Sequence, residues 1–328
     1  MRTPHLRLEQ VVPLVALIVT TAVFFVSPSV TGSTLTSFSV YNVLQQLAWL
    51  APLTLALGVT LMCGEFDISV AGVAPLAGVL AIKLGADSVY TGVLIALFAG
   101  AAIGLLQGLV ISRLEISSVP VTMASYIALV GGTLWVSGNQ LLSYDSSDVA
   151  LWITRPIATF LSPATLLGLL LAVVVGVAMS VTAWGRDARA VGSDRRAARS
   201  SGVRVDRVLV LSFLTSGTLA AGSGVLLALS TGSANPNADV KPLVLGIVAA
   251  LAGGATLQGG RGRVVWIVIG ALSICLLQAT FSVNALADWL SQFLFAALLL
   301  TVAAFDAPDL ARSFSRRSAL RPAREEVA

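Results

Sequence analysis

Seven arginines lie between residues 185 and 207, and they are the densest group of side chains in the sequence that could do specific chemistry. A guanidinium presents paired N–H donors that fit a carboxylate, so Arg189, Arg195, Arg196 and Arg199 are candidates to bind acidic groups of a partner protein. The stretch separates two long apolar segments and must therefore lie in water. The alternative is a positively charged loop that only fixes membrane topology.

The same stretch carries signals for a short helix. Ser193 is an expected N-cap, Asp194 is expected in the first turn, where a negative charge is favourable, and Gly202 is expected to end the helix in the left-handed conformation. A helix of about two turns cannot bury a core of its own. We therefore expect a knob that docks into another protein at the membrane surface.

Catalytic chemistry has little support elsewhere in the chain. The single histidine, His5, rules out a Ser/His/Asp or Cys/His group and a histidine metal cluster. Cys63 and Cys275 lie in or at the end of apolar segments, where a lone thiol is usually a small buried hydrophobe. Neither lysine, Lys83 or Lys241, belongs to a phosphate-binding G-x-x-x-x-G-K-[ST] loop, so we expect no catalytic residue, metal or cofactor in this chain.

The composition requires a membrane protein. The chain has 328 residues, of which 56% are hydrophobic and 11% charged, with a mean hydropathy of +0.91. Ten apolar runs predict an all-α membrane domain of about ten transmembrane helices. Their residues are 11–26, 41–62, 69–84, 91–111, 119–137, 163–183, 208–229, 243–257, 264–281 and 289–305. The first run also resembles a cleavable signal peptide, which is the alternative interpretation of that segment.

Charge counting predicts the orientation. With ten spans, 17 of the 20 basic residues fall on the side of the termini, and only Lys83, Arg155 and Lys241 fall on the other. Basic residues favour the cytoplasmic side, so both termini are expected there. We divide the chain into a permease domain, residues 1–310 with the cytoplasmic loop 185–207, and a basic tail, residues 311–328, which is expected to lie near anionic lipid.

Polar residues in or beside the apolar runs are candidates for a hydrated pathway: Gln45, Gln107, Gln278, Asn235 and Asn237. Hydrogen bonding between helices is the alternative role. The glycine ladder Gly100, Gly104 and Gly108 is expected to serve close helix packing. No Asp, Glu or Arg occupies the middle of a span, which disfavours a proton-driven carrier but leaves a sodium-coupled one open.

A faint repeat adds a topological hypothesis. GEFDISVAGVAPLAG from Gly64 and GSANPNADVKPLVLG from Gly232 each precede a glycine- and alanine-rich span at an offset of 168, and LLQ at 105–107 recurs at 276–278. The offset corresponds to five spans, so the two halves would be inverted in the membrane.

Three segments carry a resemblance to a known family. GEFDISVAG at 64–72 resembles GGIDLSVGS, the arginine loop resembles G-R-x-x-x-A-x-G-x-x-x-x-A-A-R-x-S-G-[IV], and GGATLQGGRG at 253–262 resembles GGTSLSGGRG. All three are typical of ribose-type permeases of binding-protein-dependent ABC sugar importers, and they occur in the family's order. Glu65 and Phe66 depart from the pattern, as does SSVP at 117–120.

The resemblance implies a permease subunit in a bacterial plasma (inner) membrane that translocates a pentose, hexose or related polyol. It also implies an ATPase subunit that binds the ATP, an extracytoplasmic sugar-binding protein, and a second permease copy or paralogue; no nucleic-acid partner is expected. The segment with Arg189, Asp194, Arg195, Arg196, Arg199 and Gly202 would couple to the ATPase. Glu65 and Asp67 are expected on the same side, with a helix cap as the alternative for Asp67. An ion-coupled secondary carrier and a membrane enzyme with an unrecognised site remain the alternative functions.

Overall fold

The computed structural model describes residues 8–31, 34, 36–144, 147–157, 159–237 and 239–301. Of these described residues, 79% are helical. The helices run in the order α1 (Leu8–Thr31), α2 (Ser37–Met62), α3 (Val70–Leu84), α4 (Val89–Leu114), α5 (Ser118–Ser137), α6 (Asp148–Thr154), α7 (Pro163–Val181), α8 (Ala183–Ser193), α9 (Arg195–Ser200), α10 (Val205–Thr231), α11 (Lys241–Ala252) and α12 (Val264–Val283). A last described helix covers Asp288–Thr301.

The prediction of an all-α membrane protein is confirmed. In the described chain six helices are long and apolar enough to cross a membrane, namely α2, α4, α5, α7, α10 and α12. Shorter apolar helices occupy the other four expected segments. The count of ten spans stays a prediction, and the basic tail 311–328 lies outside the described residues.

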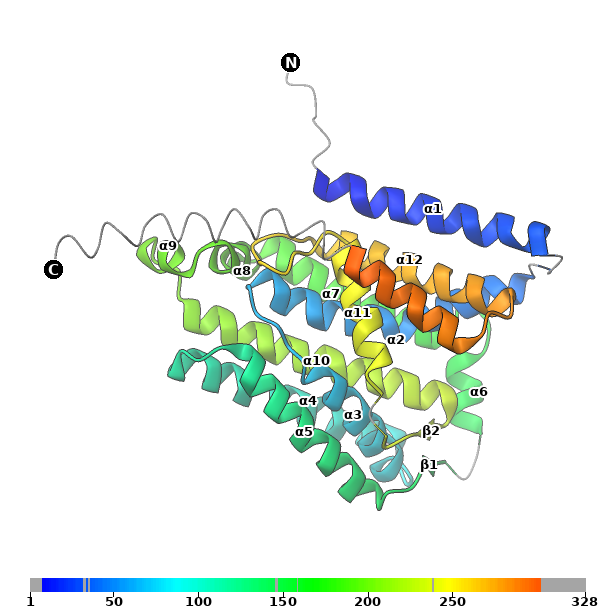
Figure 1. The fold of residues 1–328 in the computed structure, drawn as a ribbon. Helices are drawn as coiled ribbons and strands as arrows, with labels where there is room; N and C mark the ends of the chain where they lie inside the picture. Colours follow the sequence, from blue (N-terminus) through cyan, green and yellow to red (C-terminus); the bar gives the residue numbers. More distant parts are fainter. Residues whose placement is uncertain are drawn as a thin grey trace.

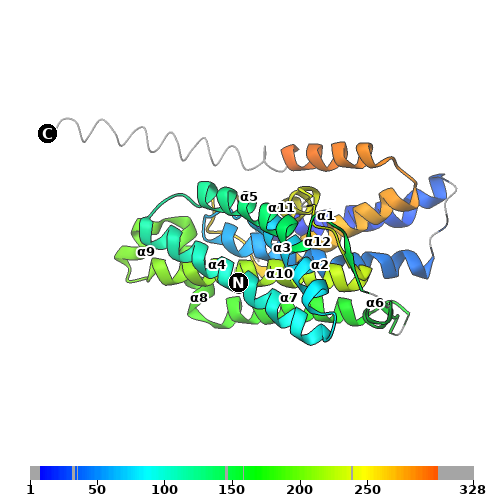
Figure 2. The ribbon, with the colours of Figure 1, turned by 90° about the horizontal axis from the view of Figure 1, so that it is seen from below.

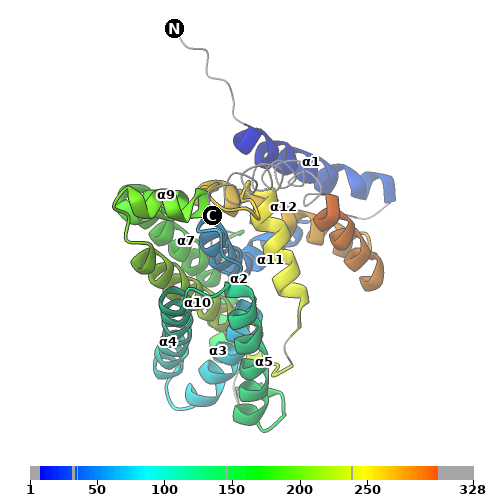
Figure 3. The ribbon, with the colours of Figure 1, turned by 60° about the vertical axis from the view of Figure 1, so that its left-hand side comes forward.

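Two helices form the centre of the bundle. Helices α2 and α10 pack against each other, and most of the residues in their apolar windows are buried. Around them, α10 contacts α3 and α4, while α2 contacts α7, α11 and α12 (Figures 1 and 3). Helix α1 lies outside, against α12.

The glycine ladder of α4 explains its close packing with α10. A β-carbon at Gly104 would overlap the carbonyl oxygen of Phe213, and one at Gly100 would overlap Ala221. The small residues of α4 are buried, whereas large ones such as Phe98 and Leu106 are exposed on its outer face. Where lipid surrounds the helices, apolar burial gives no net drive, so this close backbone contact has to hold the pair together.

The pairing of the central helices is consistent with the expected repeat, which stays a prediction. Helices α2 and α10 begin 168 residues apart. Helix α10 packs against α3 and α4, and α2 packs against α11 and α12, the corresponding short and long helices of the second half. The outer helices α1 and α7 do not follow this correspondence.

The two ends of the bundle differ in structure and charge. At one end lie α8, α9 and the loop before α12; at the other lie α6 and the short pair β1 (Leu142–Ser143) and β2 (Ser233–Ala234), which are antiparallel (Figures 1 and 2). Lys83, Arg155 and Lys241 belong to the α6 end, because Lys83 bonds the carbonyl of Val136 near the end of α5, Arg155 follows α6 and Lys241 starts α11. The other described basic residues lie at the α9 end.

Candidate coupling junction and pathway

The arginine-rich stretch folds into two helices, α8 and α9, whereas the sequence predicted a single short helix. Helix α8 continues through Ser193, whose hydroxyl donates to the carbonyl of Arg189. The predicted N-cap, Ser193, is therefore wrong. Asp194 takes that position, since its backbone is extended and its carboxylate accepts from the N–H groups of Arg196 and Ala197.

The predicted end of this short helix is confirmed. Ser201 is the C-cap of α9, and Gly202 follows with φ +86°. A β-carbon at Gly202 would meet nothing within 4 Å, so the demand for glycine comes from the backbone conformation and not from space. The turn lets the chain reverse from α9 into α10.

The arginines of the stretch have different surroundings. Arg195 forms an ion pair with Glu65, whose side chain is 5% exposed, and partial burial lowers the pKa of the Arg195 guanidinium. Arg199 lies 3.0 Å from Glu115 and 3.7 Å from Asp206 at the surface. Arg196 is exposed and makes no ion pair among the described residues. Arg196 and Arg199 are thus the α9 arginines that no buried carboxylate holds.

Arg189 is separate from this group. It belongs to α8, and its side chain lines a groove between α7 and α12 together with Arg263. The sequence analysis grouped Arg189 with the arginines expected to couple to the ATPase. In the fold, a turn separates α8 from α9, and Arg189 lies on a different surface from the α9 arginines.

Three glycine-containing segments meet beneath α9. The N–H of Gly260 donates to the carbonyl of Met62 at 3.0 Å, which joins the loop before α12 to the end of α2. A β-carbon at Gly192 would overlap that same carbonyl, and one at Gly259 would lie 2.5 Å from the Cα of Gly64. We call Met62–Glu65, Gly192–Arg195 and Gly259–Gly262 the coupling junction. All three segments that carried the family resemblance contribute to it.

A buried polar cluster attaches the junction to the spanning helices. The Asp67 carboxylate accepts from the backbone N–H and hydroxyl of Ser69, at 3.0 and 2.6 Å, and from the hydroxyl of Ser216 in α10 at 2.7 Å. The Ser69 hydroxyl also lies 3.0 Å from Oε1 of Gln107 in α4. Asp67 thus binds Ser69, the residue directly before α3, and it is 1% exposed. Glu65 is also buried, so both carboxylates make their contacts inside the described chain.

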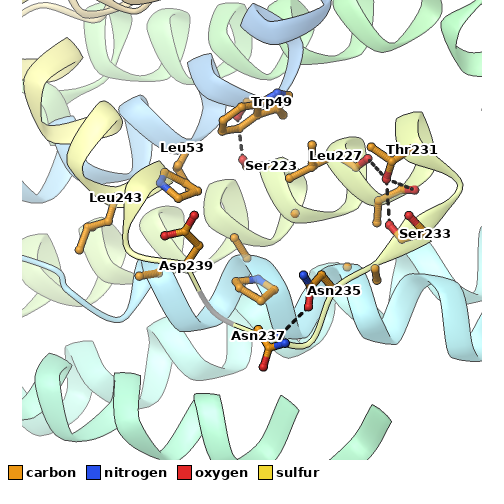
Figure 4. A pocket seen from close by; sticks show the side chains of 18 of the residues that line it. Trp49, Leu53, Ser223, Leu227, Thr231, Ser233, Asn235, Asn237, Asp239 and Leu243 are labelled. Carbon is orange, nitrogen blue, oxygen red and sulfur yellow. Dashed lines mark hydrogen bonds between the residues drawn. The ribbon is translucent and has the colours of Figure 1, made fainter. Parts of the chain in front are cut away.

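A pocket of about 490 Å³ opens among the inner helices near the other end of the molecule. Helix α2 contributes Trp49 and Leu53, and α3 lines one wall. The polar groups come from α10 and from the segment between α10 and α11 (Figure 4). The lining hydroxyl, amide and carboxylate side chains are Ser223, Thr231, Ser233, Asn235, Asn237 and Asp239. This volume lies within the range of roughly 300–1,000 Å³ typical of small-molecule sites.

The five pathway candidates separate into distinct places. Asn235 and Asn237 line the pocket, where the N–H of Asn237 bonds the side chain of Asn235. Gln45 bonds Tyr41 and Ser162 between α2 and the start of α7, and Gln107 belongs to the Asp67 cluster. Gln278 lines a second, polar cavity of about 440 Å³ at the turn from α12 into the last described helix. Trp49 and Asp239 also line the pocket but were not among the candidates from the sequence. The polar run around Asp239 was the one sequence signal for this part of the pocket.

Comparison with known proteins decides the family. Residues 42–303 match the model of the family described as "Branched-chain amino acid transport system / permease component". The chain belongs to this permease family. It is similar to the L-arabinose transport system permease protein AraH of Escherichia coli (strain K12), with 28% identity over 255 residues and 75% of each chain covered. It is also similar to the autoinducer 2 import system permease protein LsrC of Enterobacter sp. (strain 638), with 32% identity over 260 residues, 77% of this chain and 74% of LsrC covered. No solved structure matches.

The junction combines distant segments of the permease. This permease brings together three segments that are about 65 to 200 residues apart in sequence, at the end where its basic residues gather. At position 65 it carries a glutamate where the ribose-type pattern has glycine, and that glutamate is the partner of Arg195. The permease therefore has a charged contact inside a junction that is otherwise built from close backbone packing.

Proposed function

We propose that this chain is the membrane-spanning permease subunit of an ABC importer that translocates a monosaccharide, either a pentose, a hexose or a related polyol. A separate ATPase chain binds ATP, and an extracytoplasmic binding protein delivers the sugar. A second permease copy or a paralogue completes the pore. The support is the family match together with two similar proteins that are named as arabinose and autoinducer 2 permeases. Neither comparison supports the ion-coupled carrier.

The chemistry of the pocket favours a sugar over an amino acid. Hydroxyl, amide and carboxylate groups suit the donors and acceptors of a polyol, and the Trp49 ring offers an apolar face. An amino acid carries a carboxylate that needs a positive partner. Among the described lining residues the one charged side chain is Asp239, so the pocket offers no side-chain cation to such a carboxylate. This is the observation that carries the choice of substrate class.

The coupling junction supports a route from the ATPase to the pocket. Arg196 and Arg199 on α9 face outward for an acidic partner surface, while Arg195 holds α9 to Glu65. The segment after Glu65 leads through the Asp67 cluster into α3, and Val70, Ala71 and Ala74 of α3 line the pocket. Docking of the ATPase would thereby bias the inward-open and outward-open populations of the pore.

The proposal includes a membrane topology. Ten spans with both termini in the cytoplasm place α9 on the ATPase side and the pocket near the side of the binding protein. The five-plus-five inverted repeat accounts for the paired packing of α2 and α10 with their neighbours. The basic tail would lie along anionic lipid of the inner membrane.

A substrate panel tests this proposal. The permease, its ATPase and its binding protein are reconstituted in vesicles and supplied with labelled pentoses, hexoses, polyols and leucine. We expect ATP-dependent uptake of at least one sugar and none of leucine. An Asp239→Asn variant should keep assembly and lower sugar uptake, because it replaces an acceptor-only group. Uptake of leucine without any sugar would contradict the assignment of the substrate class.

A further inference from the structure

A groove on the outer surface of the permease lies between α7 and α12 and has a volume of about 710 Å³. Its walls are mainly aliphatic, and exposed Val173 and Val177 of α7 face Val265 of α12 across it. At Gly176 the two helices approach, since a β-carbon there would lie 3.3 Å from Val264. The substrate pocket has none of these residues, so the groove is a separate feature.

The length of the groove matches one leaflet of a bilayer. Along α7 it extends from Leu169 to Ser180, a rise of roughly 16 Å at 1.5 Å per residue. Half of a hydrocarbon core is about 15 Å thick. A transmembrane helix of another protein would need a groove that spans the whole hydrocarbon core. An acyl chain of one leaflet needs a groove that spans only half of it.

The mouth of the groove is positively charged. Arg189 of α8 and Arg263, the residue before α12, both line it at the end of the molecule where the basic residues gather. Among the described residues neither guanidinium makes an ion pair, and none of those that line the groove is acidic. Trp266 lies at the same level, as expected for a ring at the interface with the headgroups.

We propose that this groove binds an anionic phospholipid of the cytoplasmic leaflet, with the phosphate between Arg189 and Arg263 and an acyl chain along α7. Basic pockets between spanning helices on this side suit such headgroups. A second copy of the chain is a poorer occupant. A twofold axis along the membrane normal would place the same ends together and bring four guanidiniums into one contact.

The test uses purified full-length permease in detergent, without the ATPase, so that its outcome does not depend on the proposed transport function. Phosphatidylglycerol and phosphatidylcholine are titrated, and bound lipid is counted by native mass spectrometry. We expect a saturable phosphatidylglycerol site that phosphatidylcholine and inorganic phosphate do not compete for. Arg189→Gln and Arg263→Gln should each weaken it about fivefold, which corresponds to about 1 kcal/mol per basic residue.

Two further variants keep the result unambiguous. Arg186→Gln removes an exposed charge from the same helix but outside the groove, and it should leave the affinity unchanged. Gly176→Leu fills the groove and should abolish binding while both arginines remain. The proposal is overturned if Arg186→Gln weakens binding as much as the groove variants do, or if phosphatidylcholine binds equally well. A permease dimer that disappears in Gly176→Leu would likewise overturn it and assign the groove to a second copy.

Discussion

Replacing Arg195 by Gln should destabilise the permease more than replacing both Arg195 and Glu65 by Gln. The Glu65 side chain is 5% exposed and the Arg195 side chain 42% exposed. Loss of one partner leaves the buried carboxylate without a counter-charge, whereas the double replacement leaves two neutral amides. The unusual result, a second substitution that restores stability, follows directly from the burial of Glu65.

The magnitude follows from the two exposures. Breaking a fully buried pair costs about 3–5 kcal/mol, and an exposed pair contributes less than about 1 kcal/mol. Since Arg195 is partly screened by solvent, we expect about 2 kcal/mol for Arg195→Gln and less than about 1 kcal/mol for the double variant. In a chain of this size 2 kcal/mol corresponds to roughly 3 °C in the melting midpoint.

The assay is thermal unfolding of the purified variants in one detergent, followed by size-exclusion chromatography with fluorescence detection. Arg196→Gln is the matched control, because Arg196 lies on the same helix without an ion pair among the described residues, and its midpoint should not change. Glu65→Gly, which restores the residue of the ribose-type pattern, should make Arg195→Gln nearly neutral. Equal midpoints for the single and the double variant would refute the role of the buried carboxylate.

Three further predictions concern topology and packing. Cysteines at Ser200 and Ser233, in a chain without the two native cysteines, should be labelled from opposite sides of the membrane; labelling from one side would remove the ten-span topology. Gly202→Val should impair ATPase-coupled uptake while membrane insertion stays normal, because φ +86° is unfavourable for a β-branched residue; unchanged uptake would argue against a coupling role. Gly104→Ala should cost about 1–3 kcal/mol through overlap with α10, whereas Gly131→Ala, where a β-carbon meets nothing within 4 Å, should be neutral in the same unfolding assay.

The sequence was sufficient for the features that depend on local pattern. Apolar runs located the helices, the Gly100–Gly108 spacing predicted a close-packed face, and the Gly202 signal located the end of α9. The N-cap was misplaced by one residue, because Ser193 and Asp194 are both good caps and only the packing of α8 decides between them.

Contacts between distant segments could not be predicted in this way. Glu65 and Arg195 are 130 residues apart, and nothing in either local sequence indicates that they form a pair. The coupling junction arises from backbone contact between glycines of three loops, and a single sequence does not specify which loops meet. Gln45 and Gln107 are alike in the sequence, but in the fold Gln45 accepts from Ser162 before α7 and Gln107 accepts from Ser69 before α3.

The most direct test of the central claim is transport in vesicles with the energy source controlled. The permease alone should be inert, because no nucleotide motif occurs in its sequence and ATP is expected on a separate chain. With its ATPase and binding protein present, ATP on the cytoplasmic face should drive sugar accumulation, and ionophores that collapse proton and sodium gradients should change it little. Accumulation by the purified permease alone, driven by an ion gradient, would contradict the account and direct the search for an ion site to Gln107, Gln278 and residues 232–239.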